Sequence, residues 1–325
     1  MRAVVIGSYG DPGVLEVREI PDPVAEADHV VIEVTSSALN RADLLQRLGL
    51  YPGPEMEHEV PGLEFSGVVA AIGPKVTRWS VGDQVMAVTG GGAQAERLSI
   101  HERQIMAIPS SVTLADAAAI PEVFLTAFDA LVLQGGLASG GWALVHAGAS
   151  GVGTAAIQII KAIGARAVVT ASAAKLARCR ELGADVAVDY GTESFVEAVA
   201  EATGGVGVDV VLDVIGGEYT IDNITSLRVG GKLLQVGVMG RQKVELPLGM
   251  LLPKRASIVG TVLRARPLEE KAALTQLFVR QLIPRFDDGS LQPVIDRRFT
   301  IDEIADAHRY METNANIGKV IIDVQ

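Results

Sequence analysis

The sequence predicts an α/β fold: a doubly wound six-stranded parallel sheet inserted in a mainly β domain that forms a partly open barrel. Three observations lead to this prediction. A glycine-rich turn joins a strand to a helix, strands alternate with helices through the middle of the chain, and short apolar runs bounded by Gly, Pro and Asp precede them. We expect the parallel sheet to occupy 121–262 and the mainly β domain to occupy 1–120 plus 263–325.

The glycine-rich turn lies between a short apolar run, Ala143 to Val145, and a helix-period segment, Ala155 to Ile163. Backbone N–H groups at a helix start point at an anion, and the helix dipole favours negative charge there. Strand, turn and helix together are typical of the corner that binds the phosphates of a dinucleotide. We expect this corner to use Gly148, Ser150, Gly151, Val152 and Gly153.

The turn departs from the plain G-x-G-x-x-G pattern. Gly148-x-Ser150-x-x-Gly153 has serine in place of the second glycine, whereas Gly151-x-Gly153-x-x-Ala156 begins three residues further from the strand. We favour the first register because the turn should follow the strand directly. The Ser150 hydroxyl can then add a hydrogen-bond donor for the pyrophosphate.

The rest of the parallel sheet follows from the alternation. Strands are expected near 143–147, 166–171, 185–189, 208–213, 232–237 and 257–262, and helices near 122–134, 152–163, 173–182, 192–203, 218–227 and 246–254.

Before this region, strands are expected at 30–34, 67–72 and 84–88, with one helix at 40–48. After it, helices at 268–284 and 301–311 precede a strand at 319–323. We expect this tail to return to the first domain, which makes that domain discontinuous in sequence.

Composition excludes several classes of function. The chain has 325 residues, 49% of them hydrophobic, a net charge of -11 and a pI of about 5.0. An acidic chain is a poor partner for nucleic acid or an anionic membrane, and no uncharged apolar run reaches the roughly 18 residues of a membrane span. The N-terminal apolar run is too short for a signal peptide. One cysteine, Cys179, allows no internal disulfide and fits a reducing compartment, so we expect a cytoplasmic protein.

The chain resembles a known family, and the resemblance extends over nearly its whole length. The matching segments are Leu39-Asn-Arg-Ala-Asp-Leu44, Gln46-x-x-Gly-x-Tyr51, Pro61-Gly-Leu-Glu64, Val81-Gly-Asp-Gln-Val85, Ile120-Pro-Glu-Val-Phe-Leu-Thr-Ala-Phe128, His146 to Gln158, Asp213-Val-Ile-Gly-Gly217 and Asn316-Ile-Gly-Lys319. The chain is similar to the zinc-free quinone oxidoreductases, or zeta-crystallin-like proteins, of the medium-chain dehydrogenase/reductase superfamily. Within them it looks closest to the p53-inducible branch, through Gly90-Gly-Gly92 and Tyr310-Met-Glu-x-Asn314. The resemblance implies a GroES-like first domain and a Rossmann domain.

The resemblance also bears on metal binding. Zinc-dependent relatives carry a cysteine near the place of Asn40 and a histidine at the place of Leu63. Catalytic zinc needs about three converging ligands, and the five histidines here are scattered. We therefore expect no metal. Glu64 is expected to form structural hydrogen bonds rather than act as a base, and His146 and Cys179 are expected to be structural residues.

The cofactor is predicted to be NADPH. NAD sites usually hold an acid about 20 residues after the glycine turn, and the second strand here ends at Ser172 without one. In relatives, the positions of Ser172, Lys175 and Tyr190 take the 2′-phosphate, although Lys175 could also be a solvated side chain. Gly237 is expected to line the cofactor as well, and Thr126 to support the nicotinamide ring.

The electron acceptor is expected in a cleft between the domains, beside Asn40 and Tyr51. The Asn40 amide would donate to the acceptor carbonyl or to the nicotinamide ribose, and the Tyr51 phenol would orient the acceptor oxygen. The simpler interpretations are a helix N-cap for Asn40 and a packed loop aromatic for Tyr51.

Without zinc to stabilise an alkoxide, an acceptor that delocalises its own charge is favoured. The leading hypothesis is an NADPH-dependent reductase of quinones. The second is a reductase of α,β-unsaturated carbonyls, including enoyl thioesters. The third is an NADPH-binding protein with a structural or regulatory role. We also expect a homodimer, formed where the apolar run Ser257 to Leu263 leaves a sheet edge unpaired.

Overall fold

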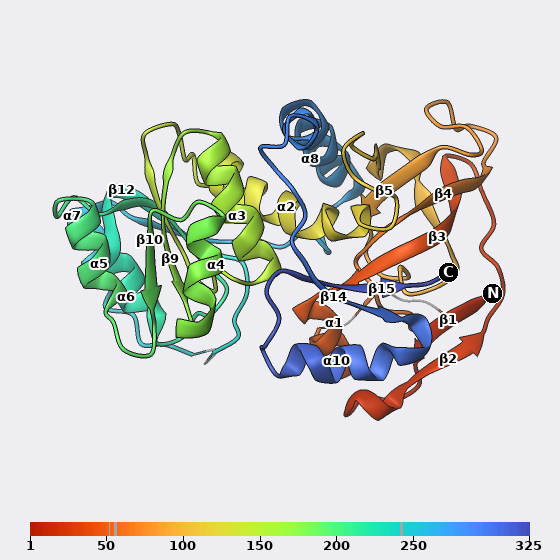
Figure 1. The fold of residues 1–325 in the computed structure, drawn as a ribbon, viewed down its shortest axis with the longest axis horizontal. Coiled ribbons are helices and arrows are strands. Elements are labelled where there is room, and N and C mark those ends of the chain that lie inside the picture. The colour runs from red at the N-terminus through yellow and green to blue at the C-terminus, as the bar shows by residue number, and fades with distance from the viewer. Residues whose placement is uncertain (52, 55–56, 241–242) are drawn as a thin grey trace. The chain divides into compact units, whose positions relative to one another are not determined.

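The computed structural model describes residues 1–51, 53–54, 57–240 and 243–325. The chain divides into two compact units (Figure 1). The first unit comprises Met1–Leu125 and Arg264–Gln325, and the second unit comprises Thr126–Leu263.

The second unit is built on a six-stranded sheet with the order β10-β9-β8-β11-β12-β13, in which every neighbouring pair is parallel. Its strands are β8 (Trp142–Val145), β9 (Arg166–Ala171), β10 (Val186–Asp189), β11 (Val208–Asp213), β12 (Leu227–Gln235) and β13 (Ser257–Gly260). The chain proceeds outward from β8 in one direction and then from β11 in the other. The predicted doubly wound parallel sheet is therefore confirmed, and its strand order reverses between β8 and β11.

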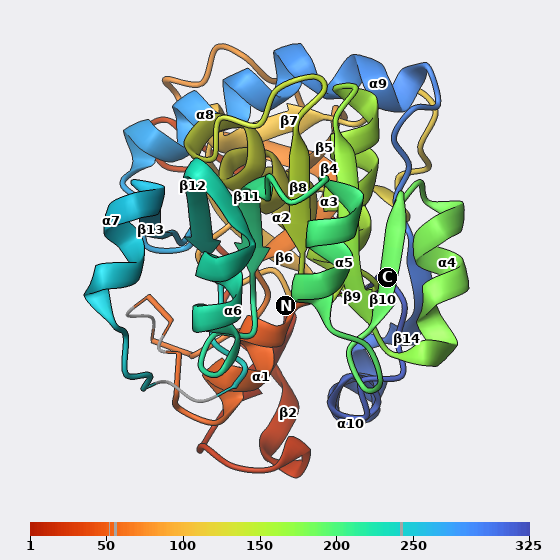
Figure 2. The ribbon, with the colours of Figure 1, turned by 90° about the vertical axis from the view of Figure 1, so that its left-hand side faces the viewer.

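Helices cover both faces of this sheet. They are α3 (Gly151–Ala162), α4 (Leu176–Glu181), α5 (Phe195–Ala202), α6 (Tyr219–Ser226) and α7 (Leu251–Lys254). Figures 1 and 2 show α3 and α4 on one face and α5 and α6 on the other. Because both faces are covered, the central strands are largely apolar, and Leu144, Val168, Val211 and Leu233 lie in one buried cluster.

Several predicted boundaries in this region differ from the structure, and two of the differences have a clear physical reason. The strand predicted near 232–237 begins earlier, because Leu227 directly after α6 already pairs with Val208 of β11. The helix predicted over 122–134 is α2 (Pro121–Phe128) followed by a π-helical segment, Asp129–Gln134. Periodicity does not distinguish these helix types, since the wider turn adds only one residue to each hydrogen-bonded ring.

The first unit holds a seven-stranded sheet with the path β14-β15-β3-β4-β5-β7, and β6 also pairs with β3. Its strands are β3 (His29–Leu39), β4 (Glu64–Ile72), β5 (Gln84–Val88), β6 (Arg97–His101), β7 (Ile105–Ala107), β14 (Ile295–Thr300) and β15 (Lys319–Asp323); β1 (Arg2–Ile6) and β2 (Leu15–Glu19) form a separate ribbon. The C-terminal strand β15 pairs antiparallel with β3, with Ile321 opposite Ala38. The C-terminal strand is therefore part of the sheet of the first unit.

The helices of the first unit are α1 (Arg41–Arg47), α8 (Leu268–Gln281), α9 (Ile283–Asp287) and α10 (Ile304–Glu312). The helix predicted over 268–284 is thus two helices. Pro284 has no N–H to donate to the carbonyl of Arg280, so the hydrogen-bond ladder of α8 cannot continue through it.

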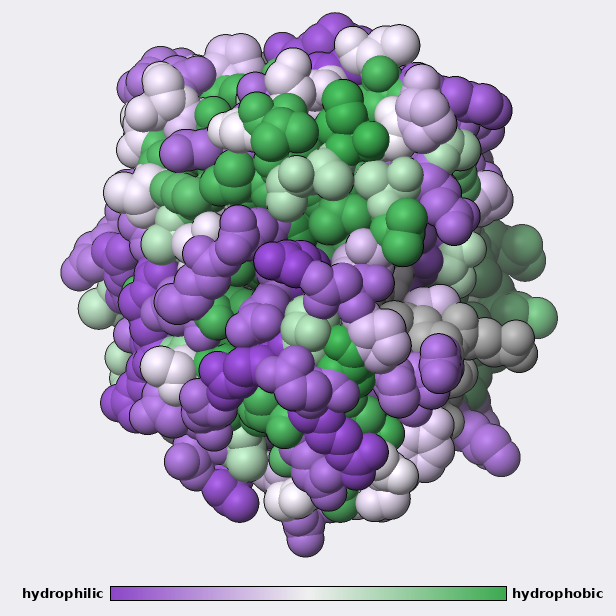
Figure 3. All heavy atoms as spheres, turned by 90° about the vertical axis from the view of Figure 1, so that its right-hand side faces the viewer, coloured by the Kyte–Doolittle hydropathy of each residue, from purple (hydrophilic) through white to green (hydrophobic). Residues whose placement is uncertain are grey.

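The core of the first unit lies between its strands and α10, and Ile32, Phe65, Val85, Ile304 and Ile322 are all buried in it. Figure 3 shows one face of this unit, where apolar side chains gather in the upper part among hydrophilic ones. Exposed apolar side chains are normal on folded proteins.

One helical stretch, 117–134, is long and apolar enough to cross a membrane by length and composition. Of that stretch 78% is buried inside the protein, as in the core helices of soluble proteins. The stretch is therefore weak evidence for a membrane span.

Candidate functional site

The glycine-rich turn follows β8 directly and leads into α3. Ser150 is the N-cap of α3, and its Oγ accepts a hydrogen bond of 3.0 Å from the N–H of Gly153. A serine at this place therefore satisfies one of the free N–H groups of the helix start. Its hydroxyl hydrogen remains available to a ligand. Gly151 and Val152 form the first turn of α3 and are half-buried.

Both Gly148 and Gly153 lie where a side chain would collide. A Cβ on Gly153 would lie 2.3 Å from the carbonyl oxygen of Ala147, and one on Gly148 would lie 2.9 Å from Cβ of Val169. Ala147 itself has a left-handed backbone, with φ of 52°. The turn is thus a close-packed cradle that only these glycines permit, and its shape fits a dinucleotide pyrophosphate at the start of α3.

Cys179 packs beneath this turn. It is fully buried, and a Cβ on Gly148 would approach its Sγ to 3.4 Å. Burial raises the pKa of the Cys179 thiol to about 11, so the thiol stays protonated near neutral pH. Cys179 is a packing residue.

Four further predicted cofactor residues follow the carboxyl ends of strands in this sheet. Ser172 and Lys175 come after β9, Tyr190 comes after β10, and Gly237 comes after β12. The N–H of Tyr190 donates to the carbonyl of Ala171, so Tyr190 and Ser172 lie side by side. Tyr190 is 56% exposed. Because the carboxyl ends of parallel strands share one edge, these residues lie at the same edge of the sheet as the glycine turn.

A buried polar network supports this edge from below. His146 Nε2 lies 2.6 Å from Asn223 Oδ1, and Asn223 Nδ2 donates to Asp213 at 3.0 Å. Since the Asn223 amide nitrogen faces Asp213, its oxygen faces His146, and Nε2 must carry the proton. Burial lowers the pKa of His146, which keeps the ring neutral. His146 is structural, and the sequence did not reveal its partners because Thr170 lies 24 residues and Asn223 lies 77 residues further along.

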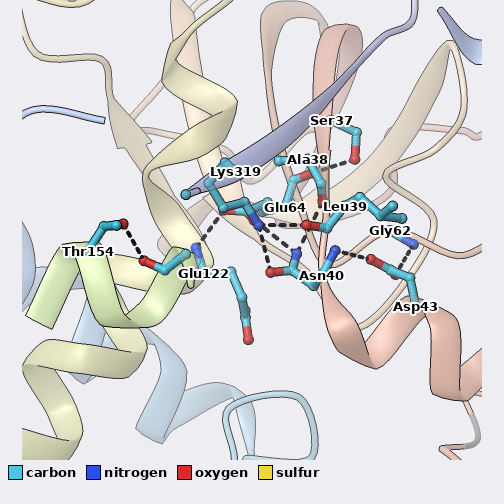
Figure 4. Close-up of polar contacts among 12 residues, drawn as sticks. Ser37, Ala38, Leu39, Asn40, Asp43, Gly62, Glu64, Glu122, Thr154 and Lys319 are labelled. Atoms are coloured by element: carbon cyan, nitrogen blue, oxygen red, sulfur yellow. Dashed lines mark hydrogen bonds and ion pairs between the residues drawn. The ribbon is translucent and has the colours of Figure 1, made fainter. Parts of the chain in front are cut away.

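The first unit holds a second polar centre, around the ammonium group of Lys319 (Figure 4). Lys319 is 3% exposed, and its Nζ donates to the carbonyl of Leu39 at 2.8 Å and to Asn40 Oδ1 at 2.7 Å. It also forms an ion pair of 2.7 Å with Glu64, which is fully buried. We call Asn40, Glu64 and Lys319 the lysine cluster.

The lysine cluster fixes the orientation of the Asn40 amide. An ammonium group only donates, so the atom of Asn40 that faces Lys319 must be the oxygen. Nδ2 then donates to Glu64 at 2.9 Å and to the carbonyl of Ala38 at 3.1 Å. Both amide hydrogens are engaged in the protein, so the expected donation from Asn40 to an acceptor carbonyl would require a rearrangement. The second lone pair of Oδ1 remains able to accept from a ribose hydroxyl.

Asn40 also occupies the N-cap position of α1, where its backbone N–H donates a hydrogen bond to a side chain in the first turn of the helix. Its N–H donates to Asp43 Oδ2 at 2.7 Å, while Gly62 donates to the other carboxyl oxygen at 3.0 Å. Burial raises the pKa of Asp43 to about 6, although these two N–H donors oppose the shift. The Asn40 side chain therefore stands at the start of α1 and also belongs to the lysine cluster.

Glu122 lies beside the lysine cluster on α2. Its N–H donates to Glu64 Oε2 at 2.7 Å, and Figure 4 shows its side chain directed away from Lys319. Burial, and then the negative charge of Glu64, raise the pKa of the Glu122 carboxyl to about 8. Sequence reasoning quoted Glu122 and Lys319 only within family segments and assigned neither a role.

Tyr51 is half-buried in the first unit, next to Arg264 and not simply packed in a loop. Thr126 is buried on α2.

Among the described residues no group of three His, Cys, Asp or Glu side chains could hold a metal ion. At the places where zinc relatives carry ligands, the chain has Asn40, bonded to Lys319, and the buried apolar Leu63.

Comparisons with known proteins agree with this arrangement. A family model described as "Alcohol dehydrogenase GroES-like domain" matches residues 26–110, and one described as "Zinc-binding dehydrogenase" matches 151–280. The chain is 30% identical to a quinone oxidoreductase-like protein 2 homolog of Nematostella vectensis, covering 100% of this chain and 89% of that protein. It is also 30% identical to the rat (Rattus norvegicus) synaptic vesicle membrane protein VAT-1 homolog, covering 99% and 84%.

Solved structures are similar over the same length. A quinone oxidoreductase of Pseudomonas syringae has a TM-score of 0.90 at 28% identity, covering 99% of both chains. The JamJ enoyl reductase has a TM-score of 0.90 at 26% identity, covering 100% of this chain and 99% of that one. A mycobacterial protein complexed with NADPH has a TM-score of 0.90 at 28% identity, covering 100% of both.

Proposed function

Because the chain belongs to the zinc-free quinone oxidoreductase family of the medium-chain dehydrogenases/reductases, we propose that it is an NADPH-dependent, zinc-independent reductase of quinones. The oxidoreductase class follows from the family. The observation that supports the finer proposal is the lysine cluster, in which the Lys319 ammonium holds the side chains of Asn40 and Glu64. A protein cation thus sits among the positions where zinc relatives place ligands.

The choice of NADPH rests on the edge of the second-unit sheet. Neither Ser172 nor Lys175 after β9 is an acid that would bind a ribose hydroxyl or repel a 2′-phosphate. Tyr190 lies beside Ser172 and is exposed to a ligand. The similar mycobacterial structure, which is complexed with NADPH, supports the same choice.

Bound NADPH would supply the hydride, and the chain's own residues bind and orient the two reactants. The N–H groups at the start of α3 and the Ser150 hydroxyl would hold the pyrophosphate. The Asn40 oxygen, fixed by Lys319, would accept from the nicotinamide ribose. Thr126 would support the ring, and the Tyr51 phenol would donate a hydrogen bond to the acceptor oxygen. The reduced quinone can take its proton from water.

Two experiments test this proposal. Wild-type enzyme should retain full activity with quinones in excess chelator, and elemental analysis should find no stoichiometric zinc. Lys175→Ala should lower kcat/KM with NADPH but leave that with NADH nearly unchanged. Zinc that is lost together with activity would contradict zinc independence. An equal kcat/KM with NADPH and NADH, unchanged in Lys175→Ala, would contradict the preference for NADPH.

The acceptor site is tested by substitution. Tyr51→Phe and Asn40→Ala should each lower kcat/KM for quinones by roughly ten- to a hundredfold, about 1–3 kcal/mol of transition-state stabilisation. Folding should remain intact. Wild-type kinetics in both variants, across several acceptors, would place the chemistry elsewhere.

A second candidate is the reduction of α,β-unsaturated carbonyls, including enoyl thioesters, since the similar JamJ structure is an enoyl reductase. Such acceptors also delocalise the charge that arrives with the hydride. A spectrophotometric screen with NADPH and quinones, enals and enoyl thioesters separates the two. Tight NADPH binding without turnover on any of them would favour a structural or regulatory protein instead.

We further propose that the protein is a cytoplasmic homodimer. Strand β13 lies at an edge of its sheet, and Ile258 is 40% exposed, while nearby Val262 is 44% exposed. An apolar edge with unpaired backbone groups favours pairing with a second copy. Ile258→Lys should yield a monomer by light scattering at micromolar concentration. A monomeric wild type would contradict the proposal, and cell fractionation tests the location.

A further inference from the structure

Arg264 is a buried cation that joins three segments of the first unit: helix α1, the loop that follows it and the loop that follows β5. It is 9% exposed. Its Nε donates to the carbonyl of Gly90 at 2.7 Å, one terminal nitrogen donates to the carbonyl of Tyr51 at 3.2 Å, and the other donates to Gln46 Oε1 at 2.8 Å.

All three of these acceptors are neutral. No carboxylate among the described residues forms an ion pair with Arg264, although most buried arginines are paired with one. Withdrawing a guanidinium from water without a directly bonded opposite charge is costly. Asp43 interacts with the Arg264 charge only at longer range, and this interaction lowers the Asp43 pKa. A cost of this kind is commonly retained where a function needs the charge.

The Tyr51 ring packs against this charge. The guanidinium carbon lies 5.0 Å from the ring centroid, within the range of a cation–π contact. Arg264 thus holds Tyr51 twice, by its backbone carbonyl and by its ring. Gly53 makes this possible, because a Cβ there would lie 2.8 Å from both an Arg264 terminal nitrogen and Gln46 Nε2.

The charged groups around the Tyr51 phenol have opposite effects on its pKa. Burial raises the pKa of the Tyr51 phenol, and the negative charges of Glu122 and Asp43 raise it further. The positive charge of Arg264 lowers it. Lys271 of α8 lies near both Glu122 and Arg264. Arg264 is therefore the group that opposes the carboxylates at this phenol.

We propose that Arg264 is a positioning residue for the reaction: it fixes Tyr51 and polarises the phenol O–H, so that Tyr51 donates a stronger hydrogen bond to the acceptor oxygen. This inference rests on the proposed role of Tyr51 as the group that contacts that oxygen. As the hydride brings two electrons to the acceptor, negative charge develops on its oxygen. Tyr51 keeps its proton and stabilises this charge through the hydrogen bond, and the oxygen is protonated later by water.

A substrate-free experiment tests the electrostatic part. The ionisation of Tyr51 is followed by ultraviolet difference titration, as the absorbance of each protein minus that of its Tyr51→Phe counterpart. The phenol midpoint should rise in Arg264→Gln and stay near the wild-type value in Arg264→Lys, which keeps the charge. An unchanged midpoint in Arg264→Gln overturns the proposal, whatever the acceptor is. Should Arg264→Gln fail to fold, Arg264→Lys is compared with wild type in the second experiment.

A kinetic cycle tests the link to the reaction. Arg264→Gln should lower kcat/KM about tenfold with a benzoquinone and with an enone, and Arg264→Lys should lower it less. In a Tyr51→Phe background, Arg264→Gln should cost less than about threefold, since both residues act through one phenol. A full tenfold loss in that background would mean that Arg264 merely holds the loops, and would overturn the proposal.

Controls separate these outcomes from general damage. Arg280→Gln removes an exposed arginine from α8 and should change neither the titration nor the kinetics. Unfolding midpoints and NADPH affinity are measured for every variant. If the wild type reduces none of the acceptors, the proposed function fails, while the phenol titration still decides whether Arg264 acts on Tyr51.

Discussion

The two polar centres of this protein are built by opposite means. The glycine turn of the second unit presents backbone N–H groups from one continuous segment, 147–153. The lysine cluster of the first unit joins side chains that lie 24 to 279 residues apart. One centre depends on close packing of the backbone and the other on balanced buried charge, so substitutions and pH should affect them differently.

The largest effect should come from removing the cation of the lysine cluster. Lys319→Met leaves the fully buried Glu64 without its ion-pair partner. We expect the free energy of unfolding to fall by about 3–5 kcal/mol, because an uncompensated buried charge is left behind. Denaturant unfolding measures this.

The double variant Lys319→Met with Glu64→Gln should recover part of that loss, since it removes both charges. Lys161→Met, which breaks an exposed pair with Asp185, should cost less than about 1 kcal/mol. A Lys319→Met protein as stable as this control would show that charge balance does not stabilise the lysine cluster.

A second effect of buried charge should appear in acid. His308 is fully buried on α10, with Nδ1 3.3 Å from an Arg47 terminal nitrogen, and Arg47 in turn pairs with Glu312. Burial, and then the Arg47 charge, lower the pKa of His308 to about 3. In the unfolded chain His308 therefore binds a proton near pH 6.5, whereas in the folded protein it stays neutral until about pH 3.

Stability should consequently fall as pH drops below 6.5 toward 3, by about 3 kcal/mol at pH 4 from this residue. His308→Asn cannot titrate and keeps an acceptor for Arg47, so its acid limb should be flatter. The two proteins are compared by urea unfolding between pH 4 and 8. Parallel curves would mean that His308 is protonated without penalty.

The glycine turn should instead respond to added volume. Gly153→Ala would place a Cβ 2.3 Å from the Ala147 carbonyl oxygen, which the backbone can relieve only by moving. We expect a loss of about 1–3 kcal/mol in stability and weaker NADPH binding. Fluorescence titration with NADPH measures the second effect.

Gly249→Ala is the matched control, because a Cβ there meets nothing within 4 Å. It should change neither quantity. If Gly153→Ala binds NADPH like this control, the turn is not the close-packed cradle that its geometry indicates.

The smallest effect should come from Glu122, which is half-buried beside the lysine cluster. The folded pKa of the Glu122 carboxyl, about 8, lies above the ordinary glutamate value of 4.5, so the folded protein holds the proton more tightly than the unfolded chain. The resulting stabilisation is present below pH 4.5 and is lost as pH rises through 8. After allowance for solvent contact it amounts to about 1–2 kcal/mol.

Glu122→Gln should therefore show a flatter stability curve between pH 5 and 9, and at pH 9 it should be more stable than wild type. Unfolding in urea at each pH checks this. A variant that loses stability on alkalinisation as wild type does would show that Glu122 is ionised throughout.

Sequence alone determined the second unit well. Its central strands β9 and β11 are largely apolar and its phosphate-binding turn is contiguous, so apolar runs and glycine spacing were sufficient to predict these two strands with their observed bounds. The missed boundaries lie at β12 and at the π-helical segment after α2. Both depend on which residues the backbone groups hydrogen-bond to, in a neighbouring strand or in the preceding helical turn. The hydrophobic period of the sequence does not encode these hydrogen-bond partners.

In the first unit, the sequence placed Asn40 at a helix start and predicted that Glu64 forms structural hydrogen bonds. Only the tertiary structure brought Lys319 to them, because β15 pairs with β3 and carries its first residue to the end of that strand. The same pairing turned the Asn40 amide toward the protein. Short-range patterns specify backbone conformation, but the partner of a buried charge is decided by which distant strands lie side by side, and that depends on the packing of the whole unit.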